Sequence, residues 1–102
     1  MNLNIYFLYK KGDILSYRFV FDAEKSMRNL IKHGIDFQQA QGIWSDGDRV
    51  EVRALSDTEN RWIVTGLIGD KHWTAIITYR AEFVRVISVR RARREEIERY
   101  ES

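Results

Sequence analysis

The sequence contains no cysteine and no proline, and only two of its 102 residues are histidines. Without cysteine the chain can form neither a disulfide framework nor a thiolate metal site. A zinc site would have to depend on carboxylates, and no residues have the spacing of such a site. We therefore expect no metal ion and no cofactor. The absence of proline favours regular helices and strands joined by short connections.

Several enzyme signatures are missing as well. The chain has no glycine-rich phosphate loop and no nucleophile elbow, and its serines lack the context of an activated nucleophile. These absences argue against an acyl-transfer enzyme. The apolar start, residues 2–9, is too short to cross a bilayer and lacks the flanks of a signal peptide. We therefore expect a cytoplasmic protein that does not contact a membrane.

The residues that are present predict one small globular domain. Apolar residues make up 44% of the chain and include three tryptophans, which is typical of a folded core. Residues 18–102 are expected to form this domain. Residues 1–17 are expected to be an N-terminal extension, with a weak strand pair around residues 11–13.

The first helix is expected over residues 23–33, with Asp22 as its N-cap and Gly34 ending it. Helical spacing places four apolar residues on one stripe of this helix: Ala23, Met27, Leu30 and Ile31. Four polar residues fall on the opposite side: Lys25, Arg28, Asn29 and Lys32.

A second helix is expected from Asp36, which forms a capping-box pair with Gln39. Its apolar side is formed by Phe37, Ala40, Ile43 and Trp44. A short strand is expected over residues 18–21, and four more over 49–55, 61–68, 71–79 and 83–89. The last helix is expected over residues 91–101. The fold class is therefore α+β, a four-to-five-stranded antiparallel sheet with two N-terminal helices and one C-terminal helix.

Arginines crowd the junction between the last strand and the last helix, at positions 90, 91, 93 and 94. The N-terminus of a helix carries partial positive charge, so added cations there favour an anion, phosphate above all. The spacing of Arg91 to Glu95 and of Arg94 to Glu98 also fits a solvated helix with salt bridges.

Two further side chains are candidates for chemistry. Strand alternation places Arg85 on one face with Phe83, Ile87 and Val89, so the arginine needs a ligand or an ion pair, for instance with Glu96 or Glu82. His33 is either a helix-ending side chain favoured by the helix dipole or a proton-transfer group. Cations together with one imidazole suit metal-independent RNA cleavage, in which the 2′-hydroxyl attacks the adjacent phosphate.

The chain resembles the BrnT-type toxins over residues 19–100. The opening signature consists of Phe19 to Asp22, Lys25, Asn29, Leu30, Lys32 to Ile35, Phe37 and Ala40. The closing signature consists of Arg61, Gly66, Arg80, Arg85 to Ala92, Glu96 and Tyr100. Tyr79 stands where an acidic residue is common in that family, so no carboxylate base is assigned there.

This resemblance implies a RelE-like fold and a ribonuclease toxin of a type II toxin–antitoxin system that degrades RNA and blocks translation. It implies a BrnA-type ribbon-helix-helix antitoxin as partner, with operator DNA bound only through the antitoxin. The catalytic candidates are His33, Lys32, Arg80, Arg85 and Arg90. The phosphate-binding candidates are Lys25, Arg61, Arg91 and Arg94, with Glu96 and Tyr100 as supporting residues. The alternative is a module that binds RNA or antitoxin through the same cationic face without cutting.

Overall fold

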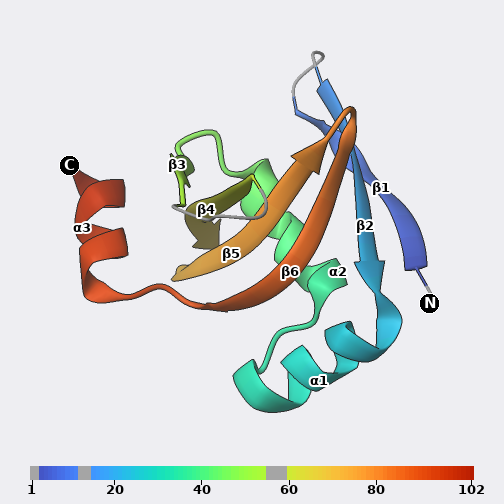
Figure 1. The fold of residues 1–102 in the computed structure, drawn as a ribbon. Coiled ribbons are helices and arrows are strands. Elements are labelled where there is room, and N and C mark those ends of the chain that lie inside the picture. Colours follow the sequence, from blue (N-terminus) through green and yellow to red (C-terminus); the bar gives the residue numbers. More distant parts are fainter. Residues whose placement is uncertain (1–2, 12–14, 55–59) are drawn as a thin grey trace.

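A computed structural model describes the backbone of residues 3–11, 15–54 and 60–102, and side chains of these ranges from residue 18 onward (Figure 1). The elements in chain order are β1 Leu3–Lys11, β2 Leu15–Asp22, α1 Ala23–His33, α2 Phe37–Ala40, the 3-10 helix η1 Gln41–Ser45, β3 Val50–Arg53, β4 Arg61–Ile68, β5 Lys71–Arg80, β6 Phe83–Arg91 and α3 Arg94–Glu101. The α+β class is confirmed.

The six described strands form one sheet in the order β1-β2-β6-β5-β4-β3. Strands β3 to β6 form the expected antiparallel meander. The expectation of a purely antiparallel sheet is wrong, because β2 pairs with β6 in parallel. The pairing joins two strands that are separated by three helical segments and three strands. It is therefore a long-range contact, and no local turn in the sequence predicts it.

Strands β1 and β2 form an antiparallel pair, as the weak strand pair near the N-terminus predicts. The connection between them, residues 12–14, lies outside the described residues. Strand β2 begins at Leu15, within the segment expected as an extension, and joins the meander through β6. The backbone before residue 18 is thus part of the sheet.

One face of the sheet is covered by α2 and η1, while α1 lies below the end of β2 (Figure 1). The apolar side predicted for the second helix is buried as expected: Phe37, Ala40, Ile43 and Trp44 are all 0–1% exposed. The capping box of Asp36 and Gln39 is present. Core residues from the sheet include Phe19, Val64, Ala75, Ile77 and Val89. This layer anchors the start of α2 while leaving the opposite sheet face partly open.

Helix α1 has the predicted ends, and its polar side chains are the ones that it buries. The Asp22 side chain accepts backbone hydrogen bonds from the first turn, and Gly34 takes a left-handed φ of 80° at the C-cap. The side chains that α1 buries are Ser26 and Asn29. The apolar stripe does not enter the core, because polar contacts to neighbouring backbone groups set the rotation of the helix.

Helix α3 begins at Arg94 and not at Arg91, since β6 continues until Arg91 pairs with Trp73. Its buried side chain is Glu96. Among the described residues, no helix is long and apolar enough to cross a membrane.

Candidate functional site

A wedge-shaped opening lies between α1 and β6, because the chain leaves the sheet at the end of β2. Strand β2 pairs with β6 only as far as Val20 with Arg85. The chain then turns at Asp22 into α1, which returns to β6 near Val89. The part of β6 between these two contacts borders the opening.

Asn29 closes the far end of the wedge by acting as a substitute strand partner for β6. Its Nδ2 donates to the carbonyl oxygens of Val89 and Ile35, at 2.8 Å each, and its Oδ1 accepts from the Val89 N–H at 3.2 Å. Ser26 Oγ accepts from the Phe37 N–H at 2.9 Å. These contacts fix α1 with its cationic side along the wedge.

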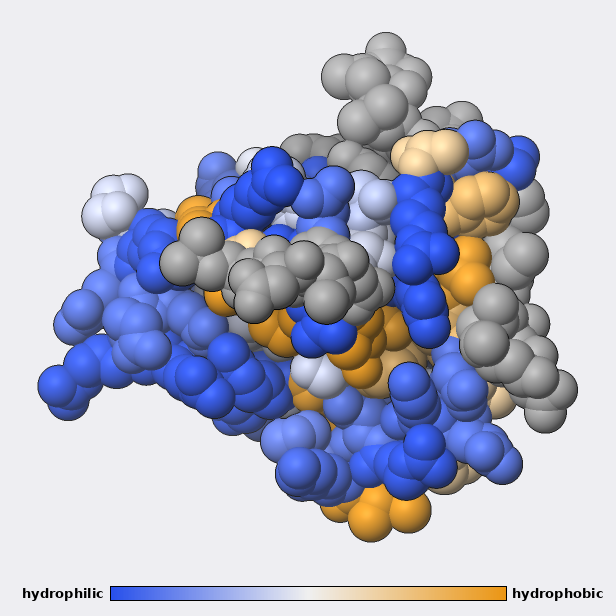
Figure 2. All heavy atoms as spheres, in the orientation of Figure 1, coloured by the Kyte–Doolittle hydropathy of each residue, from blue (hydrophilic) through white to orange (hydrophobic). Residues whose placement is uncertain are grey.

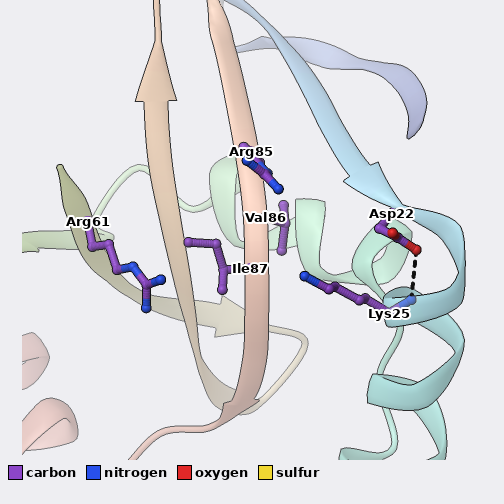
Figure 3. Close-up of a pocket in the computed structure, with 6 residues that line it drawn as sticks. All are labelled: Asp22, Lys25, Arg61, Arg85, Val86 and Ile87. Atoms are coloured by element: carbon purple, nitrogen blue, oxygen red, sulfur yellow. Dashed lines mark hydrogen bonds between the residues drawn. The ribbon is translucent and has the colours of Figure 1, made fainter. Parts of the chain in front are cut away.

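The wedge contains a groove of about 160 Å³ in which three cations meet. Figure 3 shows Arg85 on β6, Lys25 extending from α1 toward β6, and Arg61 reaching over from β4. The groove is lined by Asp22, Lys25, Arg61, Arg85, Val86 and Ile87. Three positively charged side chains from three elements therefore surround one opening.

Strand register explains why arginines from β4 and β6 come together. Arg61 pairs with Thr78 of β5, and Thr78 pairs with Arg85. Residues paired across strands have their side chains on the same face. Thr78 lies between the two arginines, is 2% exposed, and its Oγ1 has no hydrogen-bond partner among the described residues. Sequence analysis missed Thr78, although the short turns that join these strands already fix its register.

A β-bulge at Ile87 changes the sheet face on which the following side chains of β6 lie. Ile76 pairs with Ser88 and Ile77 with Val86, so Ile87 is the extra residue. Val89 consequently lies in the core and not on the face of Arg85. The expected grouping of Val89 with Arg85 is wrong for this reason. Ile87 and Ser88 instead border the groove along α1.

This second groove, of about 370 Å³, continues the first along α1. It is lined by Lys25, Arg28, Lys32 and His33 of α1 together with Ile87 and Ser88 of β6, among others. Lys25 and Ile87 line both grooves, so the two form one continuous surface. We call the two together the α1–β6 groove. It brings together Lys25, Lys32, His33, Arg61 and Arg85 from the candidates predicted by sequence.

The two glutamates considered as partners for Arg85 are engaged elsewhere. Glu82 binds Arg18 at 3.1 Å, and Glu96 binds Arg90. The carboxylate in the groove, Asp22, caps α1, and backbone hydrogen bonds led by that of Lys25 lower its pKa. Within the described part of the chain Arg85 has no carboxylate partner. A partly buried guanidinium in this position is suited to an anionic ligand.

The arginines of the strand–helix junction do not join this groove. Arg90 forms a fork with Glu96, Nη1 to Oε1 and Nη2 to Oε2 at 2.8 Å each. Burial acts to raise the pKa of Glu96, but hydrogen bonds from Arg90, from the Arg93 N–H and from Thr74 hold it at about 2. Glu96 therefore contacts Arg90 and not Arg85. The pair holds α3 in place.

The neighbouring arginines have separate surroundings. The Arg91 guanidinium lies 5.3 Å from the Trp73 ring centre, and its Nε donates to the His72 carbonyl oxygen. Arg94 is exposed at the start of α3.

The single phosphate site expected from Arg80, Arg85, Arg90 and Arg91 is therefore not brought together. Arg90 lies on the sheet face of Arg85, but opposite Thr74, four residues along β5 from Thr78, and it binds Glu96 there. Arg91, opposite Trp73, lies on the other face.

The remaining candidates lie outside the groove. Tyr100 donates to Asp46 Oδ2 at 2.7 Å, and this hydrogen bond raises the pKa of Tyr100 to about 12. Arg80 is exposed at the end of β5, opposite Phe83 and on the same sheet face as Thr78. It lies two residues along β5 from the row that contains Arg85.

The described side chains include no group of three or more histidine, aspartate or glutamate residues that could hold a metal ion. The α1–β6 groove is lined mainly by cations, which suit phosphate oxygens.

A comparison with protein-family models matches residues 21–96 to the family described as ribonuclease toxin, BrnT, of type II toxin–antitoxin system. The match runs from the end of β2 through the whole meander to Glu96, so it covers every residue that lines the α1–β6 groove. A search of curated proteins gave no match.

Proposed function

The chain belongs to the BrnT family of ribonuclease toxins of type II toxin–antitoxin systems, and from this premise we propose that the α1–β6 groove is its RNA-cleaving site. The observation that carries the proposal is the meeting of Lys25, Arg61 and Arg85 at one opening, where no carboxylate of the described residues binds Arg85. Guanidinium forks match the oxygens of a phosphodiester, and they stay charged at any physiological pH.

We propose a cleavage that uses protein groups alone. The 2′-oxygen of the ribose attacks the phosphorus atom, and the bond from phosphorus to the 5′-oxygen breaks. The 2′-hydroxyl proton goes to a base, and the departing 5′-oxygen takes a proton from an acid. The products end in a 2′,3′-cyclic phosphate and a 5′-hydroxyl. Arg61, Arg85 and Lys25 stabilise the extra negative charge of the pentacoordinate phosphorus in the transition state.

His33 is the proton-transfer group in this proposal, and it acts as either the base or the acid. It lines the same groove as Lys25, at the end of α1. Lys32, the preceding residue, holds the RNA backbone beside it. Arg80 contacts RNA outside the groove, because it lies on the same sheet face near the end of β5. The cationic lining disfavours binding of a divalent metal ion, which supports a metal-independent mechanism.

Cleavage of cellular RNA by this groove would inhibit translation and growth in the cytoplasm. As a member of a type II system, the toxin has an antitoxin partner. We propose a BrnA-type ribbon-helix-helix antitoxin, through which the complex would contact operator DNA.

The test is cleavage of a mixed-sequence RNA by the purified protein in the presence of EDTA, with analysis of the product ends. We expect cleavage with cyclic-phosphate and 5′-hydroxyl ends. Arg85→Ala, purified in the same way, is the control for contaminating nucleases, and it should cleave at least about 100-fold more slowly. Intact RNA that is nevertheless bound would support the non-catalytic module. Cleavage that stops in EDTA would refute metal independence.

A further inference from the structure

The outer face of α1 carries the largest exposed apolar side chains of the described residues. Ile31 is 79% exposed and Met27 is 57% exposed. Figure 2 shows an apolar patch at the lower edge of the molecule, where α1 lies, below a belt of hydrophilic residues. Burying Met27 and Ile31 against a partner would stabilise a complex, since apolar area removed from water contributes roughly 25 cal/mol per Å².

A groove adjoins Met27, with a volume of about 150 Å³. Its lining combines the apolar residues Phe21, Ala23, Met27 and Leu30 with the polar residues Ser26, Asp36 and Gln38. Residues 23, 27, 30 and 31 have the spacing of one helical stripe, so the exposed residues and the apolar side of the groove form one surface. We call it the α1 stripe. Its groove has about the volume of one large apolar side chain.

Cations border the α1 stripe on its solvent side. At 100° per residue, Arg28 lies about 60° around the helix from Ile31, and Lys32 lies just beyond. Both are exposed, and both also line the α1–β6 groove. A segment bound on the α1 stripe therefore lies beside two positive charges and at the rim of the candidate RNA site.

We propose that the α1 stripe docks an amphipathic, acidic helix of the antitoxin. Apolar side chains of that helix cover Met27 and Ile31, and acidic side chains pair with Arg28 and Lys32. This inference rests on membership in a toxin–antitoxin family and on the proposed site. It adds the surface and the chemistry of the partner. Arg28 and Lys32 also line the α1–β6 groove, so acidic side chains that pair with them occupy cations at the rim of the candidate RNA site.

Other occupants fit the surface less well. RNA gains most of its binding energy from phosphate contacts, and the α1 stripe itself offers apolar carbon. A second copy of this chain, packed through the same face, would bring two sets of Arg28 and Lys32 close together. The resulting repulsion opposes a symmetric dimer, whereas an acidic partner turns the same charges into attraction.

The test uses the double substitution Met27→Glu with Ile31→Glu, at positions that face solvent, and the antitoxin encoded beside the toxin gene. We expect the variant to arrest growth as the wild type does. Co-expressed antitoxin should no longer rescue growth, and affinity for the purified antitoxin should fall at least about 100-fold. Ser102→Glu adds negative charge at the C-cap of α3, away from α1 (Figure 1), and is the control that should be rescued normally.

Unchanged antitoxin affinity in the double variant would overturn the proposal. Loss of a wild-type dimer, measured by light scattering, would overturn it in favour of a second copy. Reduced RNA affinity with intact antitoxin binding would overturn it in favour of RNA. If the wild type fails to arrest growth, the proposed nuclease function fails. The antitoxin affinity of the double variant then still decides the docking surface.

Discussion

At the scale of single residues, the amide of Asn29 determines how α1 is rotated. Its side chain bonds the N–H and carbonyl of Val89, which lie beyond the part of β6 that β2 pairs with. A buried backbone group without a partner costs about 1–3 kcal/mol. The need to satisfy β6 therefore outweighs burial of the apolar stripe, and Ile31 stays in water.

We expect Asn29→Ala to lower the free energy of unfolding by about 2–4 kcal/mol, because it leaves backbone groups of Val89 and Ile35 unpaired in a buried place. Urea denaturation monitored by tryptophan fluorescence measures this change. Arg28→Ala, one residue earlier and exposed, should stay within about 0.5 kcal/mol of the wild type. A loss below about 1 kcal/mol in Asn29→Ala would show that other contacts hold α1.

Substitution of His33 by alanine tests whether this residue acts in the chemical step or in RNA binding. Removing a proton-transfer group should slow the chemical step by about 100-fold or more and leave RNA affinity within about 3-fold. Single-turnover cleavage gives the rate, and binding to an RNA with a 2′-deoxy group at the cleaved position gives the affinity. Arg99→Ala on α3 is the matched control for a general loss of positive charge. Equal losses of rate and affinity in His33→Ala would assign His33 to RNA binding only.

Residue-level features were only partly predictable. The caps at Asp22 and Gly34 follow from local backbone chemistry, and the structure confirms both. Arg85 was recognisable as an arginine that needs a partner, because its strand neighbours are apolar. The burial of Asn29 was not predictable, since its role depends on a backbone edge of β6 that is sixty residues away along the chain.

At the scale of elements, α3 is held to the sheet by a polar network and not by an apolar face. Thr65 and Thr74 share a hydrogen bond of 2.8 Å, and Thr74 donates to Glu96, which binds Arg90. Glu96 also accepts from the Arg93 N–H at the start of the helix. The carboxylate thus connects β5, β6 and the first turn of α3.

We expect Glu96→Gln to lower the free energy of unfolding by about 2–4 kcal/mol, because it leaves the Arg90 guanidinium without its charge partner. Amide hydrogen exchange should show that α3 loses protection first. Glu98→Gln, exposed on the same helix, is the control and should have little effect. Unchanged protection of α3 in Glu96→Gln would contradict this account.

The Glu96 carboxylate should also make the stability of the folded protein depend on pH. Its pKa is about 2 in the folded protein against 4.5 as the ordinary value. The folded state therefore favours the ionised form, and the stability from Glu96 is complete above pH 4.5 and is lost as the pH falls toward 2. Thermal melts between these pH values should show a steeper loss in the wild type than in Glu96→Gln. If stability falls equally with pH in the wild type and in Glu96→Gln, the pH dependence does not come from Glu96.

Element order and meander were predictable from capping residues, alternation and short turns. The parallel pairing of β2 with β6 was not, because no local signal records a contact between such distant strands. The bulge at Ile87 was not either, since strict alternation across residues 83–89 looks regular. These two features create the wedge and orient its lining, so the site's position could not be derived from spacing alone.

At the scale of the whole molecule, α1 separates two surfaces of different chemistry. One side carries Lys25, Lys32 and His33 along the α1–β6 groove, and the other carries the apolar α1 stripe. The net charge of +2 does not reveal this division, because the charges of acidic and basic residues cancel in the sum. The arginines of the last strand do not converge, for a different reason: Arg85 lines the groove, whereas Arg90 lies farther along β6 and binds Glu96.

The most direct test of the central claim is the amide chemical-shift map of the protein bound to a short RNA with 2′-deoxy riboses, which binds but cannot be cleaved. We expect the largest changes around the α1–β6 groove, at Lys25, Arg61, Arg85, Ile87 and Ser88. The amides of residues 91–94 at the start of α3 should change little. Changes concentrated at residues 91–94, with the groove unaffected, would contradict the central claim.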